Sequence, residues 1–140
     1  MKVMLKNVRL SFPSLFKTEQ YAGEDTEKYA ATFLIPKSDT KTVASIEQAC
    51  KQALVEKYGE GKVPKGFKMP LVDGDDKEYQ GYADCVCIKA NTKKRPTLVN
   101  RDKTPIAEED GILYGGCYVN ASIDVWVMDN SYGKKVLANL

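Results

Sequence analysis

Runs of apolar residues, either alternating with polar ones or continuous, predict a chain built mainly of strands. The predicted strands span residues 2–10, 28–36, 84–90, 113–128 and 134–140. The run at 28–36, KYAATFLIP, is rich in β-forming residues and is stopped by Pro36. A turn at 129–133 is expected to join the last two strands.

The strand predicted at 113–128 has the cleanest alternation. One face is apolar and is assigned to the core, and it carries Cys117, Val119, Ala121, Ile123, Val125 and Val127. The other face is polar but also carries two large aromatic residues, Tyr118 and Trp126. Burial in a core does not explain these two rings, which makes them candidates for binding.

One helix is predicted between the second and the third strand. Ser38 or Asp39 can cap its first turn, and apolar residues at three-four spacing continue from Val43 to Tyr58. The glycines that follow residue 58 end the helix. The apolar stripe is expected to face the core, and no function is assigned to it.

The remaining segments are predicted to be loops. Pro13 is expected to end the first strand, and residues 17–27, 59–82 and 101–111 to be mostly irregular. A short strand is expected at 97–99. Several strands with one central helix predict a mainly β fold, a small barrel or sandwich with the helix packed on one end.

Composition bounds the function only loosely. The 140 residues fit one domain, with 43% hydrophobic and 29% charged residues and a formal net charge of +2. The arrangement of the charges is more informative, because the stretch 88–101, IKANTKKRPTLVNR, is basic and has no acid before Asp102. Taken alone, this stretch is either a nucleic-acid footprint or a solvated loop.

The side chains exclude several classes of site. The chain has no histidine, which excludes Ser-His and Cys-His nucleophiles and histidine-ligated metals. Its four cysteines include no CxxC pair, so we expect free thiols in a reducing compartment and neither metal nor cofactor. The segment 73–82, DGDDKEYQGY, looks like a calcium loop but lacks the EF-hand pattern, and a turn is expected.

No apolar run approaches the ~18 residues that a membrane span requires. The first ten residues have charges among the apolar ones and lack the core of a signal peptide. We therefore expect no membrane partner and a cytoplasmic location.

Four blocks follow one another along nearly the whole chain: KNVRLSFPSLF, YAATFLIPK, RPTLVNRD and GILYGGCYVNASIDVW. Together they resemble a family of bacteriophage single-stranded DNA-binding proteins, long known only as a domain of unknown function. The resemblance implies an OB-fold over residues 1–140, a five-stranded Greek-key barrel with long loops. It implies binding of single-stranded DNA without strong sequence preference during phage replication or recombination, without catalysis, in the cytoplasm of the infected or lysogenic bacterial host.

A binder of single strands needs cations along the phosphates and flat rings on which bases stack. The candidates for phosphate contacts are Lys6, Arg9, Lys89, Lys93, Lys94, Arg95 and Arg101. The candidates for stacking are Phe12, Tyr114, Tyr118 and Trp126. The resemblance implies contacts for five of them: Arg9 in the first block, Arg95 and Arg101 in the third, and Tyr114 and Tyr118 in the fourth.

Proteins of this kind often end in an acidic tail that recruits replication partners and competes with DNA. This sequence ends at Leu140 in a predicted strand, so either the tail has been removed or the protein lacks it. If the tail is missing, we expect weak binding of duplex DNA to remain. The other expected partners are phage or host replication and recombination proteins, and a homo-oligomer.

Two other functions remain open. An OB-like module that recruits replication or recombination enzymes would use the acidic stretch 73–78 as its docking edge. An enzyme that uses lysine or carboxylates would need a pocket with clustered carboxylates or a strongly perturbed lysine.

Overall fold

The structure is a computed structural model that describes residues 1–77, 79, 81–130 and 133–140. Its long elements are the strands β1 (Lys2–Ser14), β4 (Tyr29–Pro36), β6 (Cys85–Thr92), β7 (Tyr118–Asn130) and β8 (Gly133–Asn139) and the helix α1 (Thr40–Tyr58). The short elements are the strands β2 (Gln20–Tyr21), β3 (Glu24–Asp25) and β5 (Leu71–Asp73) and the 3₁₀ turns η1 (Gly74–Asp76) and η2 (Glu108–Asp110).

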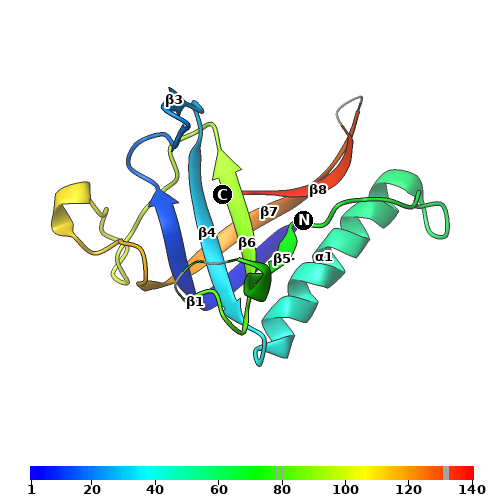
Figure 1. The fold of residues 1–140 in the computed structure, drawn as a ribbon, viewed down its shortest axis with the longest axis horizontal. Helices are drawn as coiled ribbons and strands as arrows, with labels where there is room; N and C mark the ends of the chain where they lie inside the picture. The colour runs from blue at the N-terminus through cyan, green and yellow to red at the C-terminus, as the bar shows by residue number, and fades with distance from the viewer. Residues whose placement is uncertain (78, 80, 131–132) are drawn as a thin grey trace.

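The five long strands close into a barrel (Figure 1). The strand order is β4-β1-β7-β8-β6, and β6 pairs again with β4 to complete the circle. The contact between β6 and β8 is parallel and joins Asn91 to Asn139, while the other four contacts of the barrel are antiparallel. This is a five-stranded Greek-key barrel, and the predicted OB-type fold with one helix is confirmed.

The barrel encloses the core. Side chains that alternate along each strand point inward, and the largest fully buried ones on the strands are Leu5, Val8, Leu10, Ile35, Ile88, Ile123, Val125 and Val136. Burying one such side chain contributes about 1.5–3 kcal/mol to the free energy of folding. The alternation predicted within residues 113–128 is confirmed from Tyr118 to Trp126, because Ile123 and Val125 are buried while Tyr118 is exposed.

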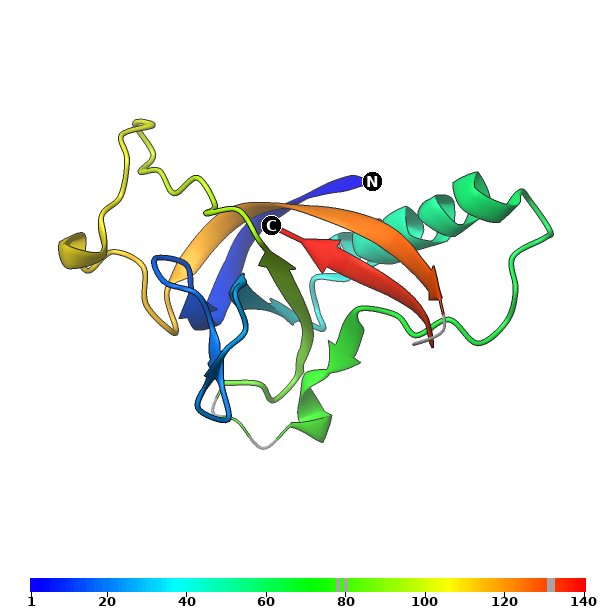
Figure 2. The same cartoon turned by 90° about the horizontal axis from the view of Figure 1, so that it is seen from above.

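Helix α1 packs against β7 and β1, and the prediction of one helix between the second and the third long strand is confirmed. Asp39 caps it by accepting a hydrogen bond from the backbone N–H of Thr42 at 3.3 Å, and Gly59 ends it. Ile46 and Cys50 are buried in the apolar stripe that packs against β7 and β1. The segment 93–117 projects from the barrel on the side away from α1 (Figures 1 and 2).

The boundaries of two strands differ from the sequence-based expectation. Pro13 does not end β1, which continues to Ser14 after an irregular step in its pairing with β4. A bulge of this kind lets a proline sit in a strand without breaking a regular ladder of hydrogen bonds. Strand β7 begins at Tyr118 and not at residue 113, because residues 114–117 form a turn closed by a hydrogen bond from Cys117 to Tyr114.

The structure also differs from the sequence-based prediction in two expected loops and one expected short strand. The expected loop at 17–27 contains the β2–β3 hairpin, and the expected irregular segment 59–82 contains β5 and η1. The strand expected at 97–99 is reduced to one bridge between Val99 and Pro105. Residues 131 and 132 of the predicted turn, and residues 78 and 80 of the predicted segment 73–82, lie outside the described residues.

Candidate nucleic-acid interface

A groove of about 1260 Å³ opens between the segment that follows β6 and the first half of β7. One rim is formed by residues 94–102 and the other by residues 118–124. Apolar side chains such as Leu98, within the first rim, and Leu113 also line the groove and pack against the barrel core. The groove is therefore an opening at the barrel surface with a polar rim on each side.

The first rim carries the basic loop, which we define as residues 93–101. Its end is held by a turn in which the backbone N–H of Asn100 donates to the carbonyl of Thr104 at 2.8 Å. The hydroxyl and the backbone N–H of Thr104 donate to Asp102 Oδ1 at 2.6 and 3.1 Å, which lowers the pKa of the Asp102 carboxyl. This local network fixes the turn while the side chain of Arg101 stays exposed.

Four of the predicted site residues line this groove: Lys94, Arg95, Arg101 and Tyr118. The three cations are exposed, and no ion pair joins them to an acid in the described part of the chain. Tyr118 stands on the opposite rim with 64% of its surface exposed. Cations on one rim and a ring on the other match the two requirements of single-strand binding, phosphate neutralisation and base stacking.

Three further predicted residues are exposed near the groove but do not line it. Lys93 precedes the lining cations on the basic loop, and Lys6 lies on β1 where its pairing with β7 is irregular. Tyr114 begins the turn that leads into β7. These three stay candidate contacts at the margin of the groove.

Two predicted cations have partners within the protein, which the sequence did not indicate. Lys89 Nζ lies 3.0 Å from Glu19 Oε2 in an ion pair. This pairing weakens the attraction between Lys89 and a DNA phosphate. Arg9 Nε donates to the carbonyl of Gly116 at 3.3 Å, and its guanidinium lies against Gly81. Arg9 is thus half-buried and connects separate segments of the chain.

Phe12 belongs to a cluster of rings with Tyr79 and Tyr82, neither of which was predicted as a site residue. The centroid of the Phe12 ring lies 5.0 Å from that of Tyr79 and 6.3 Å from that of Tyr82. Phe12 and Tyr79 are 58% and 54% exposed, whereas Tyr82 is 3% exposed. Interpreting residues 73–82 as a turn hid the two tyrosines, and their presence in an otherwise acidic segment is the only sequence signal for them.

Trp126 is not among the residues that line the groove. It is 39% exposed, and its indole Nε1 donates to Asn139 Oδ1 at 3.1 Å. It stands eight residues beyond Tyr118 on β7, about 26 Å along an extended strand. Because the groove lining on β7 reaches Asp124, Trp126 lies just beyond the end of the groove, and its stacking role stays a prediction.

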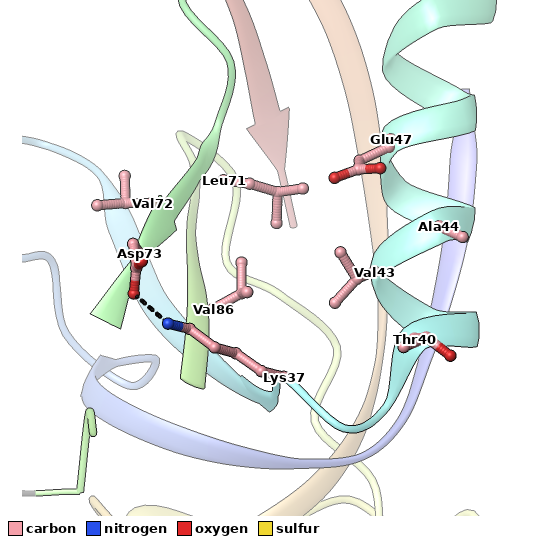
Figure 3. Close-up of a pocket in the computed structure, with 9 residues that line it drawn as sticks. All are labelled: Lys37, Thr40, Val43, Ala44, Glu47, Leu71, Val72, Asp73 and Val86. Atoms are coloured by element: carbon pink, nitrogen blue, oxygen red, sulfur yellow. Dashed lines mark ion pairs between the residues drawn. The ribbon is translucent and has the colours of Figure 1, made fainter. Parts of the chain in front are cut away.

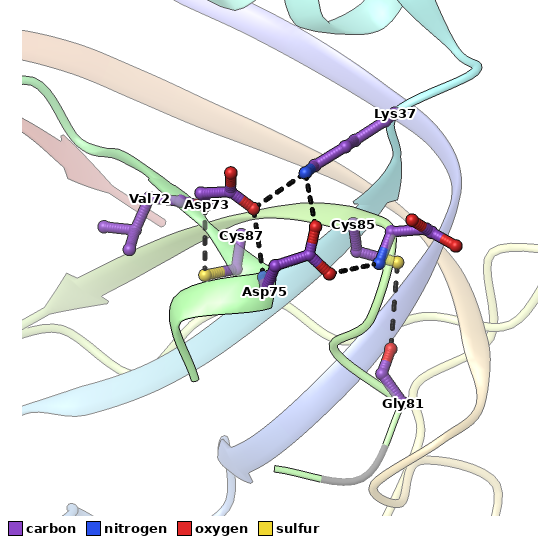
Figure 4. Close-up of polar contacts among 8 residues, drawn as sticks. Lys37, Val72, Asp73, Asp75, Gly81, Cys85 and Cys87 are labelled. Atoms are coloured by element: carbon purple, nitrogen blue, oxygen red, sulfur yellow. Dashed lines mark hydrogen bonds and ion pairs between the residues drawn. The ribbon is translucent and has the colours of Figure 1, made fainter. Parts of the chain in front are cut away.

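The acidic stretch at 73–78 is partly neutralised by Lys37 (Figure 4). Lys37 Nζ lies 2.9 Å from Asp73 Oδ1 and 2.6 Å from Asp75 Oδ2, while Asp75 Oδ1 accepts the backbone N–H of Asp84. These contacts raise the pKa of Lys37 and lower the pKa values of both carboxyls. Lysine chemistry requires a lowered pKa, so this cluster does not support an enzyme. It also weakens the stretch as an acidic docking edge.

A second hollow of about 390 Å³ lies between α1 and β5 (Figure 3). Its lining includes the carboxylates of Glu47 and Asp73 and no aromatic ring. The cation in this lining, Lys37, is paired with Asp73, so the hollow offers a single strand neither an unpaired cation nor a ring on which a base could stack.

No set of three or more side chains in the described residues is arranged to hold a metal ion. The four cysteines are free, and burial raises the pKa of the Cys50 thiol to about 11. Such a thiol is protonated at neutral pH and is a weak nucleophile. No helix in the described ranges is long and apolar enough to cross a membrane.

Comparison of the sequence with known families gives one match over residues 1–140, to the family described as the ssDNA-binding protein of Enterobacter phage Enc34. A relative from Acyrthosiphon pisum secondary endosymbiont phage 1, putative protein p50, is 41% identical over 148 residues. The alignment covers 100% of this chain and 80% of that protein.

Comparison of the fold with solved structures gives similar phage proteins. The single-stranded DNA-binding protein from bacteriophage Enc34, solved in complex with ssDNA, matches with a TM-score of 0.79 and 27% identity, over 99% of this chain and 82% of that one. The single-stranded DNA-binding protein gp2.5 of bacteriophage T7 matches with a TM-score of 0.63 and 15% identity, over 100% of this chain and 82% of that one. At that identity the T7 protein shares the fold alone.

Proposed function

Because the chain belongs to the Enc34 family of phage single-stranded DNA-binding proteins, we propose that it binds single-stranded DNA in the groove beside the basic loop. The binding activity itself serves phage DNA replication or recombination, in keeping with the family. The observation that carries this function is the match over 99% of the chain to a relative solved with bound single-stranded DNA.

In the proposed complex the two rims of the groove contact different parts of the DNA. Lys94, Arg95 and Arg101 neutralise phosphates along one rim, and a base stacks on Tyr118 at the other. Phosphates and ring faces are common to every nucleotide, so contacts of this kind carry little sequence preference. A duplex hides its base faces, so the ring selects single strands over double ones.

The wider role follows from the same premise. In this proposal the chain acts as a single binding domain without catalysis, in the cytoplasm of the infected or lysogenic bacterial host. Phage or host replication and recombination proteins, and further copies of the chain on one DNA strand, are the partners we propose for it. The binding of single strands by the Enc34 protein supports the DNA partner alone.

Charge reversal of the basic loop tests the proposed groove. We expect the double variant Arg95→Glu, Arg101→Glu to bind an oligo-dT more weakly than the unchanged protein. The slope of log K against log salt should become less negative by roughly 0.7 for each phosphate that is no longer neutralised, which is about 1.4 for two. Fluorescence anisotropy at several salt concentrations measures both quantities.

A matched control removes the effect of net charge. The double variant Lys41→Glu, Lys51→Glu changes the charge by the same amount on exposed positions of α1, away from the groove. We expect its affinity and salt slope to stay close to those of the unchanged protein. Equal losses in both double variants, or an unchanged affinity in the loop variant, would contradict the groove as the binding site.

A further inference from the structure

The backbone of β1 turns Phe12 out of the barrel. Leu10 is buried and Ser11 faces outward, so regular alternation would point Phe12 into the core. Phe12 instead has a φ of 44°, and the pairing of β1 with β4 is irregular between Ser11 and Ser14. A positive φ is unfavourable for a bulky side chain, and bulges that re-aim side chains are common beside functional sites. The backbone is therefore strained at Phe12, and its conformation leaves a large apolar ring exposed.

The exposed ring of Phe12 packs on a buried tyrosine. Tyr82 is buried beneath Phe12, and its hydroxyl makes a hydrogen bond with Ser11 Oγ at 2.8 Å. Tyr79 packs edge-to-face against Phe12 with an angle of 75° between the ring planes. Tyr82 also packs with Leu34 of β4 and Cys87 of β6 in a small buried cluster. The two outer rings keep more than half of their surface open, which packing alone does not require.

Arg9 connects this cluster to the groove. It pairs across the sheet with Tyr118, and their side chains therefore share the outer face of the barrel. A Cβ atom on Gly116 would lie 3.4 Å from Arg9 Nη2, and one on Gly81 would lie 3.0 Å from Arg9 Nη1. The guanidinium thus sits between the turn that leads to Tyr118 and the segment of Tyr79 and Tyr82, and it supplies positive charge between the two sets of rings.

We propose that Phe12 and Tyr79 form a second base-stacking site, which we name the aromatic platform. The proposal rests on the proposed function and extends it by giving the path of the DNA strand over the protein surface. The DNA leaves the groove across β1, past Arg9, and reaches the aromatic platform. It does not follow β7 to Trp126, whose indole is less exposed and already bonded to Asn139. The platform takes the face of any unpaired base, and Arg9 acts as a positioning residue.

The variants Phe12→Leu and Tyr79→Leu test the aromatic platform. Leucine keeps an apolar side chain and removes the ring, so packing changes little while stacking is removed. The probes are an oligo-dT and an abasic deoxyribose-phosphate oligomer of the same length. We expect either variant to bind the oligo-dT about 5-fold more weakly or worse, because one stacked base contributes ~1–3 kcal/mol. Binding of the abasic oligomer and the salt slope should not change, because every cation that neutralises a phosphate is still present.

The control is Met4→Ala, an exposed apolar position on β1 outside the groove lining. Its affinity for the oligo-dT should match that of the unchanged protein. Wild-type affinity of Phe12→Leu and Tyr79→Leu for the oligo-dT would overturn the platform and leave the proposed function intact. Equal losses for both oligomers would also overturn it, because they would assign the rings a structural role. Failure of the unchanged protein to bind either oligomer would overturn the proposed function and the platform with it.

Discussion

One glycine in the turn before β7 shows how the backbone positions residues of the candidate site. Gly116 has a φ of 106° in the turn before β7, and its carbonyl accepts the hydrogen bond from Arg9. A side chain at this position is strained by the backbone and also approaches the guanidinium. The glycine therefore allows the close contact between Arg9 and the turn that positions Tyr118.

Gly116→Ala tests whether the backbone conformation of Gly116 is required for the turn before β7. We expect the free energy of unfolding to fall by roughly 1–3 kcal/mol, because alanine is held in an unfavourable conformation. Urea denaturation measures the change. The neighbouring Gly115→Ala is the control, because its φ is not positive and a Cβ there meets only Pro13 at 3.8 Å. Equal stabilities of the two variants would show that the conformation of Gly116 is not required.

The predictability of individual residues depends on whether their partners are close in sequence. Exposure of Tyr118 follows from alternation along one strand, and exposure of Arg95 follows from its polar loop. The partners of Arg9 and Lys89 come from segments 107 and 70 residues away, so no local pattern reveals them. Phe12 was predicted as a stacking residue, whereas its neighbour Tyr79 was hidden in a segment interpreted as a turn.

At the scale of elements, Lys37 fastens the short β5–η1 segment to the end of β4. Its ammonium bridges Asp73 and Asp75, which flank the start of η1 (Figure 4). The hydrogen bonds from Lys37 are the largest cause of the lowered pKa of each carboxyl. In the unfolded chain these carboxyls titrate near their ordinary value of 3.8.

The ion pairs of Lys37 with Asp73 and Asp75 make the fold less stable as the pH falls. Because the folded carboxyls have lowered pKa values, their contribution is fully present above about pH 4 and disappears as the pH falls through those values. We therefore expect Lys37→Met to be less stable than the unchanged protein at pH 7 and equally stable at low pH. Thermal denaturation between pH 7 and pH 2 measures the difference.

The exposed Lys51 on α1 provides the control, because Lys51→Met removes one charge away from the bridge. Its stability relative to the unchanged protein should vary little with pH. A difference between Lys37→Met and the unchanged protein that persists undiminished at pH 2 would contradict the bridge as its cause.

The elements differ in how well the sequence predicts them. Helix α1 and strand β4 were predicted closely, because the apolar period and the flanking cap or proline agree. The end of β1 was not, because an irregular step in the strand pairing accommodates Pro13, and this depends on β4. The β2–β3 hairpin and β5 are two or three residues long, too short to leave a periodic pattern.

At the scale of the whole molecule, the barrel separates two faces. Helix α1 and the hollow beside it lie on one side, and the segment with the basic loop projects from the other (Figures 1 and 2). The net charge of +2 is small, so binding of a polyanion depends on collecting cations on the projecting side. The fold class and the family follow from the sequence, whereas the groove does not, because it needs segments that the barrel brings together.

The most direct test of single-strand binding is a parallel titration of the unchanged protein with a labelled oligo-dT and with a duplex of matched length, at several salt concentrations. We predict tight binding of the single strand that weakens with salt by a slope of roughly −0.7 per neutralised phosphate, and clearly weaker binding of the duplex. Absence of binding to both ligands at low salt would contradict the function. Equal affinity for the two would contradict the claim that ring stacking selects the single strand.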